Sequence, residues 1–180
     1  MSSRLTPVFY DFEASSLDGV PIEIGWATCD ATGTIMSDGW LILPPAEWAI
    51  DAVWDPDAEA LHGITQAMLK AHGKPPFQVA QLLNTAVAGR DVFADSPFDE
   101  AWLNQLFDAA GLEPTFQLRR MLADLYIDAN ARRLGLDQPA IDTLHSRADE
   151  VAPRTHRAEA DARHWATLWQ LVRRAGLHGQ

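Results

Sequence analysis

Apolar residues in the first part of the chain come in short runs that are rich in aromatic and branched side chains. Three such runs, residues 7–13, 21–29 and 34–43, are typical of β-strands. The turn-forming segments Gly19-Val20-Pro21 and Ala31-Thr32-Gly33 separate them. The pattern therefore predicts three antiparallel strands joined by hairpins.

Further along the chain the apolar residues recur at helical spacing. A polar, proline-bearing loop over residues 44–56 holds Trp48 and Trp54, for which packing and stacking on nucleobases are both open. The elements predicted after it are short helical pieces over 57–71, a helix over 76–88, a strand over 91–94, a helix over 97–110, a candidate strand over 115–118, and helices in most of the remainder, the last over 156–175. Antiparallel strands followed by strand–helix alternation predict an α/β fold with a mixed sheet.

The first predicted strand carries two carboxylates inside an apolar run. Asp11 and Glu13 alternate with Tyr10 and Phe12, so both acids face the same side of a strand that should be buried. Two neighbouring carboxylates in a core are unfavourable unless a cation lies between them. The strand therefore predicts a cation site.

Two predicted helices also carry acids on faces that should be buried. Asp99 lies at the start of the apolar face of its helix. It is also the third residue after Ser96, a position from which its side chain could cap the start of the helix. Asp161 lies within the apolar seam of the last helix. The residue four positions later is Trp165, so no basic side chain stands there to form an ion pair with Asp161. The alternative for Asp161 is a partly exposed acid at the edge of that seam.

The candidate chemistry is that of hard cations and a histidine. Carboxylates without a cysteine cluster favour Mg²⁺ or Mn²⁺, and the single cysteine, Cys29, excludes a disulfide framework or zinc–thiolate site within one chain. Two such ions can stabilise the attacking and leaving oxygens of phosphoryl hydrolysis. His156, five residues before Asp161, is either a surface histidine or the base that takes a proton from water.

Length and charge set further limits. The 180 residues suit a single domain over 1–180. No apolar run approaches a membrane span and the start, MSSRLTP, has no signal-peptide core, so a cytoplasmic protein is expected. The net charge is −11, and residues 1–69 carry eleven acids and one base, Arg4. Bulk charge should therefore not attract long nucleic acids, and a polyanion would be met locally by arginines or metal ions.

Three segments, in this order, resemble the motifs of the DEDDh family of 3′–5′ exonucleases, which includes proofreading exonucleases, RNase T and oligoribonuclease. They read FYDFEASSLDG, FADSPFDEAWL and THRAEADARH. PIEIGWA is similar to the family's second strand, and LHGIT to its nucleotide-contacting turn. The resemblance extends from about residue 7 to residue 172. It implies an RNase H-like mixed sheet flanked by helices.

The resemblance also implies roles for individual residues. Asp11 would bridge two metal ions that Glu13 and Asp161 help to hold, and Asp99 would support the second ion. His156 would be the general base. The positions that match the family's substrate contacts are Phe12, Ala14, Ser15, Leu17, Leu61, His62 (alternatively a surface or cap residue) and Ile64.

Two departures from the family pattern leave alternatives open. Where family members commonly have His-Asn, this chain has Ala94-Asp95, so Asp95 could share or replace the role of Asp99. The first motif continues Ala14-Ser15-Ser16 in place of Thr-Thr-Gly or similar, so no preference for a terminal base is inferred.

The leading hypothesis is a metal-dependent 3′–5′ exonuclease that releases nucleoside monophosphates from single-stranded RNA or DNA 3′ ends, or from short oligonucleotides. The acidic charge favours short substrates, and RNA slightly over DNA. One alternative is a non-catalytic nucleotide- or partner-binding module of the same fold. Another is a polymerase-associated proofreading subunit, although nothing after Ala175 resembles a partner-binding tail. Several stand-alone relatives are dimers, so a homodimer is an assembly to consider by analogy.

Overall fold

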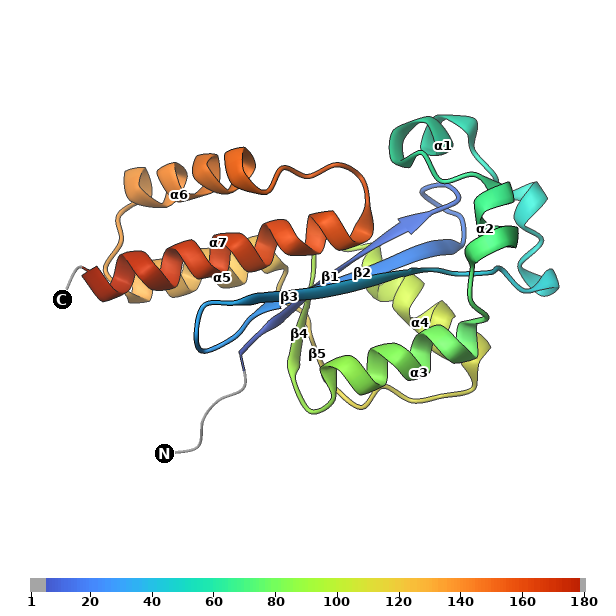
Figure 1. Ribbon diagram of the computed structural model, residues 1–180, viewed down its shortest axis with the longest axis horizontal. Helices are drawn as coiled ribbons and strands as arrows, with labels where there is room; N and C mark the ends of the chain where they lie inside the picture. Colours follow the sequence, from blue (N-terminus) through green and yellow to red (C-terminus); the bar gives the residue numbers. More distant parts are fainter. Residues whose placement is uncertain (1–5, 179–180) are drawn as a thin grey trace.

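One mixed sheet forms the centre of the molecule (Figure 1). The computed structural model describes residues 6–178, so residues 1–5 and 179–180 of the predicted domain lie outside it. The sheet order is β3-β2-β1-β4-β5, in which β1–β2 and β2–β3 pair antiparallel and β1–β4 and β4–β5 pair parallel. The strands are β1 (Val8–Ala14), β2 (Pro21–Cys29), β3 (Ile35–Leu41), β4 (Asp91–Ala94) and β5 (Gln117–Arg119). The predicted α/β class and mixed sheet are confirmed.

The helices are close to the predicted ranges. They are α1 (Pro56–His62), α2 (Gln66–His72), α3 (Pro76–Val87), α4 (Asp99–Ala110), α5 (Ala123–Arg133), α6 (Gln138–Val151) and α7 (Ala158–His178), with 3₁₀ turns at Ala46–Trp48 and Ile50–Ala52. Helix α4 begins two residues later than predicted because residues 96–98 form a turn, and α7 also begins two residues later, at Ala158. Within residues 6–178, no helix combines the length and hydropathy needed to cross a bilayer.

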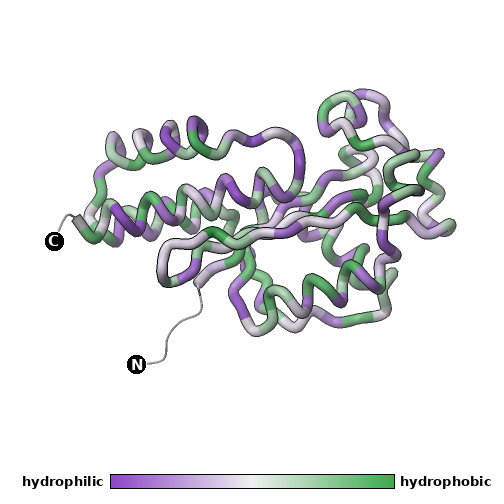
Figure 2. The backbone as a smooth tube through the Cα atoms, viewed as in Figure 1, coloured by the Kyte–Doolittle hydropathy of each residue, from purple (hydrophilic) through white to green (hydrophobic). Residues whose placement is uncertain are grey.

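The side chains of β1 alternate between two cores. Tyr10 and Phe12 pack with α3 and α4 on one side of the sheet, and Phe9 packs with α5 and α7 on the other (Figure 1). Because side chains repeat every second residue, Asp11 and Glu13 follow Phe9 onto the α7 side. Helix α6 lies outside this layer, and hydrophilic residues recur along it (Figure 2).

The loop after β3 packs against a smaller core. Trp48 and Trp54 contact a cluster that includes Ile22 and Ile64, and the Trp54 indole nitrogen donates a hydrogen bond to Glu59 at 2.7 Å. Of the two interpretations of these tryptophans, the structure therefore shows packing.

The start of α7 approaches β2 closely at Gly25. A Cβ atom added there would lie 2.1 Å from the backbone nitrogen of Glu159 and 2.2 Å from the carbonyl carbon of Ala158. Gly25 is also the partner of Asp11 in the β1–β2 register. The missing side chain thus lets α7 begin directly beside the strand that carries the carboxylates.

We expect Gly25→Ala to lower the free energy of unfolding by about 3 kcal/mol, because backbone atoms must move to admit the methyl group. Gly39→Ala on the neighbouring strand is the matched control. Its added Cβ would lie 3.0 Å from the Cβ of Glu159 and 3.2 Å from the carbonyl oxygen of Ile24, contacts that need a much smaller shift than those at Gly25, so its loss of stability should be smaller. Urea denaturation of both variants checks this, and a Gly25→Ala variant as stable as wild type would contradict it.

Candidate active site

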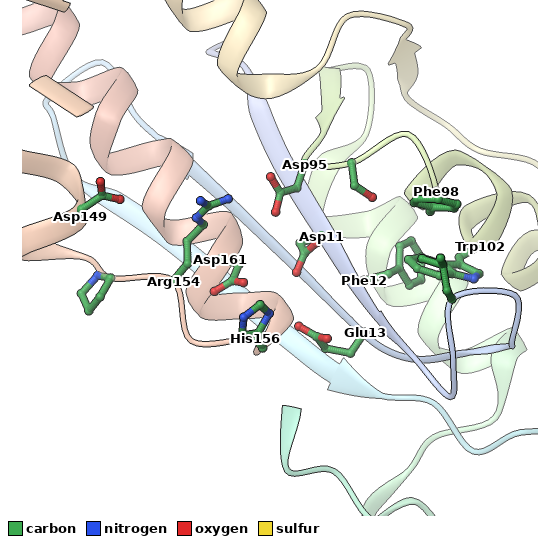
Figure 3. Close-up of a pocket in the computed structure, with 13 residues that line it drawn as sticks. Asp11, Phe12, Glu13, Asp95, Phe98, Trp102, Asp149, Arg154, His156 and Asp161 are labelled. Carbon is green, nitrogen blue, oxygen red and sulfur yellow. The ribbon is translucent and has the colours of Figure 1, made fainter. Parts of the chain in front are cut away.

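Three carboxylates from β1 and α7 converge on the α7 side of the sheet. Asp11, Glu13 and Asp161 each offer an oxygen, and these oxygens all lie within 4.8 Å of one another. All three residues are buried, with exposed fractions of 6%, 9% and 5%. Figure 3 shows the three side chains pointing toward one another. The two carboxylates of β1 are thus joined by a third, which lies 150 residues after Asp11 in the sequence, and the three could hold a cation.

The proton affinities of these carboxylates show how unfavourable their ionised state is without a cation. Burial, followed by the charge of Asp161, raises the pKa of Glu13 to about 8. Burial and the nearby charge of Asp99 also raise the pKa of Asp11 well above its ordinary value. A divalent cation would offset both causes, since it replaces lost solvation and neutralises the repulsion. Hard oxygen donors in this arrangement fit Mg²⁺ or Mn²⁺.

Asp99 serves the start of α4 with one oxygen only. Its Oδ2 accepts a hydrogen bond from the backbone N–H of Ser96 at 2.8 Å, which is the capping contact considered from the sequence. Its Oδ1 is buried and has no hydrogen-bond partner within residues 6–178. Burial raises the pKa of Asp99 to about 7. A buried oxygen without a donor is costly, so this atom also fits a site that receives a cation.

Asp95 lies nearer the open side of the site. Its Oδ1 accepts a hydrogen bond from the Trp165 indole nitrogen at 2.8 Å, and its side chain lines the cavity described below. Burial raises the pKa of Asp95, while the Trp165 hydrogen bond and the charge of Arg154 oppose that shift. Asp95 thus has a donor and a cationic neighbour, whereas Asp99 retains an unpartnered oxygen.

His156 lies in the loop between α6 and α7 and lines the same cavity. Its backbone has a φ of 54°, in the left-handed region that few residues other than glycine adopt. The next residue holds this conformation in place. The Arg157 guanidinium donates two hydrogen bonds to the Glu23 carboxylate, at 3.0 and 2.5 Å, and the backbone N–H of Ala158 donates another at 3.0 Å.

The first part of that loop is tied to α7. The His164 ring nitrogen Nδ1 lies 2.9 Å from the carbonyl oxygen of Ala152. The backbone N–H of Thr155 donates to Asp161 Oδ1 at 2.7 Å. A carboxylate of the cation site therefore also fixes the loop that presents His156.

An open cavity of about 620 Å³ is lined by Asp11, Glu13 and Asp161 together with Asp95 and His156, whereas Asp99 lies outside this lining and outside the converging trio. One end is aromatic: Phe98 and Trp102 stack with ring centres 6.0 Å apart, and Phe98 is 45% exposed. The lining residues are Asp11, Phe12, Glu13, Leu17, Asp95, Ser96, Phe98, Trp102, Asp149, Pro153, Arg154, His156 and Asp161. Six of these residues were not predicted to belong to the site: Ser96, Phe98, Trp102, Asp149, Pro153 and Arg154. Phe98 directly precedes Asp99 in the segment FADSPFDEAWL, which is a signal in the sequence. Arg154 lies in a loop without a periodic pattern, so the sequence holds no such signal for it.

The predicted substrate-contacting residues occupy different environments. Phe12 and Leu17 line the cavity, whereas Leu61 is 57% exposed and outside its lining. Ala14 is buried at the end of β1. The remaining three are also buried in packing or backbone contacts: Ser15 Oγ accepts from the N–H of Val20 at 3.0 Å, His62 Nδ1 accepts from the N–H of Ile64 at 3.0 Å, and the Ile64 side chain is fully buried.

The Arg157–Glu23 pair provides a stability test. Removing the guanidinium leaves the buried Glu23 carboxylate with the Ala158 N–H and beside Glu13, its partner in the strand register. We expect Arg157→Gln to lower the free energy of unfolding by about 2 kcal/mol, the range of hydrogen bonds to charged groups. Arg147→Gln, at an exposed position of α6, is the control. Equal unfolding midpoints for both variants would contradict a structural role for the pair.

The raised carboxylate pKa values predict how stability depends on pH and on metal. Between the ordinary glutamate value of 4.5 and about 8, folded Glu13 retains a proton that the unfolded chain releases, so stability falls as pH rises through this window. In EDTA we expect a lower Tm at pH 8 than at pH 6. Mn²⁺ or Mg²⁺ at saturating concentration should raise the Tm by roughly 5 °C at pH 8, and by less at pH 6.

Two variants test whether that response comes from this site. Asp11→Asn removes one buried charge, so its metal-free Tm at pH 8 should exceed that of wild type while its metal response is lost. Asp108→Asn, at an exposed position of α4, should respond as wild type does. Thermal melts in EDTA and in each ion measure this. A wild-type Tm unaffected by either ion at pH 8 would argue against a cation site.

Comparison with solved structures identifies the fold of this chain. No family model matches the sequence, and no curated protein does. Among solved structures, a zinc-bound complex of E. coli exonuclease I with single-stranded DNA has a TM-score of 0.68 at 17% identity, covering 96% of this chain and 41% of that one. Another, of E. coli exonuclease I with a dA16 oligonucleotide, has a TM-score of 0.68 at 18% identity, with coverage of 95% and 41%.

The chain thus spans about two fifths of the length of these neighbours. The match covers nearly all of this chain despite the low identity. The RNase H-like fold predicted from the three motifs is therefore confirmed, and this chain shares the fold of exonuclease I.

Proposed function

We propose that this chain is a metal-dependent 3′–5′ exonuclease of the DEDDh type. The observation that carries the proposal is the convergence of Asp11, Glu13 and Asp161, all buried, beside the His156 imidazole at one open cavity. Buried carboxylates without cationic partners are costly to fold, so their clustering at an accessible cavity favours a functional site over a structural one. The shared fold with an exonuclease that binds single-stranded DNA supports the same assignment.

The carboxylates would hold the ions. Asp11, Glu13 and Asp161 would be the ligands. Asp99 would support a second ion through its Oδ1, which has no hydrogen-bond partner within residues 6–178. When bound, two Mg²⁺ or Mn²⁺ ions would stabilise charge on the attacking and leaving oxygens of the 3′-terminal phosphodiester. Hydrolysis of that bond releases a nucleoside monophosphate and shortens the strand by one nucleotide.

His156 would take the proton from the attacking water. It lies in an exposed loop at the edge of the cavity, so its ring can reach solvent, and the Glu23–Arg157 contacts hold its backbone in place. An imidazole suits this step because a ring nitrogen can accept a proton from water and later release it.

The aromatic end of the cavity would receive the terminal nucleoside. Phe98 and Leu17 are large apolar residues with exposed fractions of 45% and 62%, and both lie beside the carboxylates. A nucleobase could stack on the Phe98 ring, since base–aromatic stacking tolerates any base. The net charge of −11 limits contacts with a long backbone, which favours single-stranded ends or short oligonucleotides of RNA or DNA.

The test uses 5′-labelled single-stranded RNA and DNA of matched sequence, incubated with Mg²⁺, Mn²⁺ or EDTA and resolved on a gel. We expect a ladder that shortens from the 3′ end and is lost in EDTA. Asp11→Asn and Asp161→Asn should reduce the rate at least about 1000-fold, because each removes a ligand from ions worth several kcal/mol to the transition state. Asp108→Asn is the control for loss of an acid elsewhere on the surface.

The same assay separates Asp99 from Asp95. Loss of activity in Asp99→Asn with retained activity in Asp95→Asn would assign the fourth carboxylate to Asp99, and the reverse would assign it to Asp95. If wild type cleaves neither polymer, and Asp161→Asn behaves like wild type, the exonuclease proposal fails and a non-catalytic binding module takes its place.

A further inference from the structure

The loop between α6 and α7 is fixed at three points. The carbonyl of Ala152, the backbone N–H of Thr155 and the guanidinium of Arg157 are each bonded to α7 or β2. The residues between these points, Pro153, Arg154 and His156, instead line the cavity. The anchoring that presents His156 to the site therefore presents Arg154 as well.

Arg154 is held against an aromatic face and remains open to an anion. Its guanidinium carbon lies 5.5 Å from the ring centre of Trp165, whose indole N–H is itself bonded to Asp95. Within residues 6–178, no acid lies at ion-pair distance from Arg154, although several acids line the same cavity. A guanidinium with free N–H donors and a fixed orientation suits bidentate binding of phosphate.

Arg154 lies at the opposite end of the cavity from the aromatic residues. Figure 3 shows Phe98 and Trp102 on one side of the carboxylates and Arg154 on the other. If the terminal nucleoside occupies the aromatic end and the terminal phosphodiester lies at the carboxylates, the strand extends from there in the 5′ direction toward Arg154. Among the described residues that line the cavity, Arg154 is the one lysine or arginine available to their phosphates.

We propose that Arg154 binds the strand phosphate immediately 5′ of the linkage being cleaved. This inference rests on the proposed exonuclease function and adds a residue and a strand direction to it. The positive charge would offset the repulsion that Asp95 and Asp149, which also line the cavity, exert on an incoming polyanion. Arg154 would thereby contribute to substrate affinity, whereas the carboxylates and His156 would act on the reacting atoms.

The experiment measures steady-state release of the 3′-terminal nucleotide from a six-nucleotide single-stranded substrate in Mn²⁺. One substrate has only phosphodiesters, and the other has a neutral methylphosphonate at the second linkage from the 3′ end. We expect Arg154→Gln to raise the KM for the first substrate about 10-fold, the effect of one charge-assisted hydrogen bond, while kcat changes less than about 3-fold. The KM of Arg154→Lys for this substrate should fall between the KM of wild type and that of Arg154→Gln.

The methylphosphonate identifies the phosphate. It should lower kcat/KM of wild type about 10-fold and leave that of Arg154→Gln nearly unchanged, because each change removes the same contact. Arg147→Gln, a loss of the same charge at an exposed position outside the cavity, should match wild type on both substrates. Thermal melts of the three variants check that each is folded.

The outcomes distinguish this inference from the function on which it rests. An active wild type with an unchanged KM in Arg154→Gln would overturn the inference and leave the exonuclease in place. So would a methylphosphonate effect of equal size in wild type and Arg154→Gln, since the two changes would then be independent. A wild type that releases no nucleotide would overturn both.

Discussion

Electrostatic repulsion among Asp11, Glu13 and Asp161 is the constraint on which the rest of this structure depends. Three carboxylates in a buried space oppose folding, and the packing of β1, β2 and α7 must overcome that opposition. Gly25 lets α7 come close enough for Asp161 to join the pair on β1. The same closeness places the loop before α7 over the cavity. One unfavourable electrostatic arrangement is thus held by two cores that lie on either side of the sheet.

The sequence predicted those parts of the site that depend on local pattern. Alternation along β1 correctly placed Asp11 and Glu13 on one side, and the apolar seam of α7 correctly placed Asp161 on its buried face. The mixed sheet followed from the order of strand and helix patterns. Because the positions of the three carboxylates follow from the periodicity of single elements, they could be predicted without knowledge of tertiary contacts.

Other parts of the site depend on contacts between distant segments. Glu23 binds the N–H of Ala158 and the side chain of Arg157, more than 130 residues away, so α7 starts at Ala158 and not at the predicted residue 156. Likewise, Trp165 supports both Asp95 and Arg154, and no spacing in the sequence indicates that contact. The cavity wall opposite the aromatic residues could therefore be recognised only in three dimensions.

The two-sided packing of β1 also restricts how the length of this chain can vary. Even-numbered residues such as Tyr10 and Phe12 fill the core under α3 and α4, while Asp11 and Glu13 face α7. Deleting or inserting one residue within β1 would turn the side chains on one side of the change to the opposite face of the sheet, bringing carboxylates toward the aromatic core or aromatic rings toward the acidic cavity. Within β1 only changes in multiples of two residues preserve the parity of the strand. Length changes near β1 are therefore expected in the turn over residues 15–20 that follows it, and not within the strand.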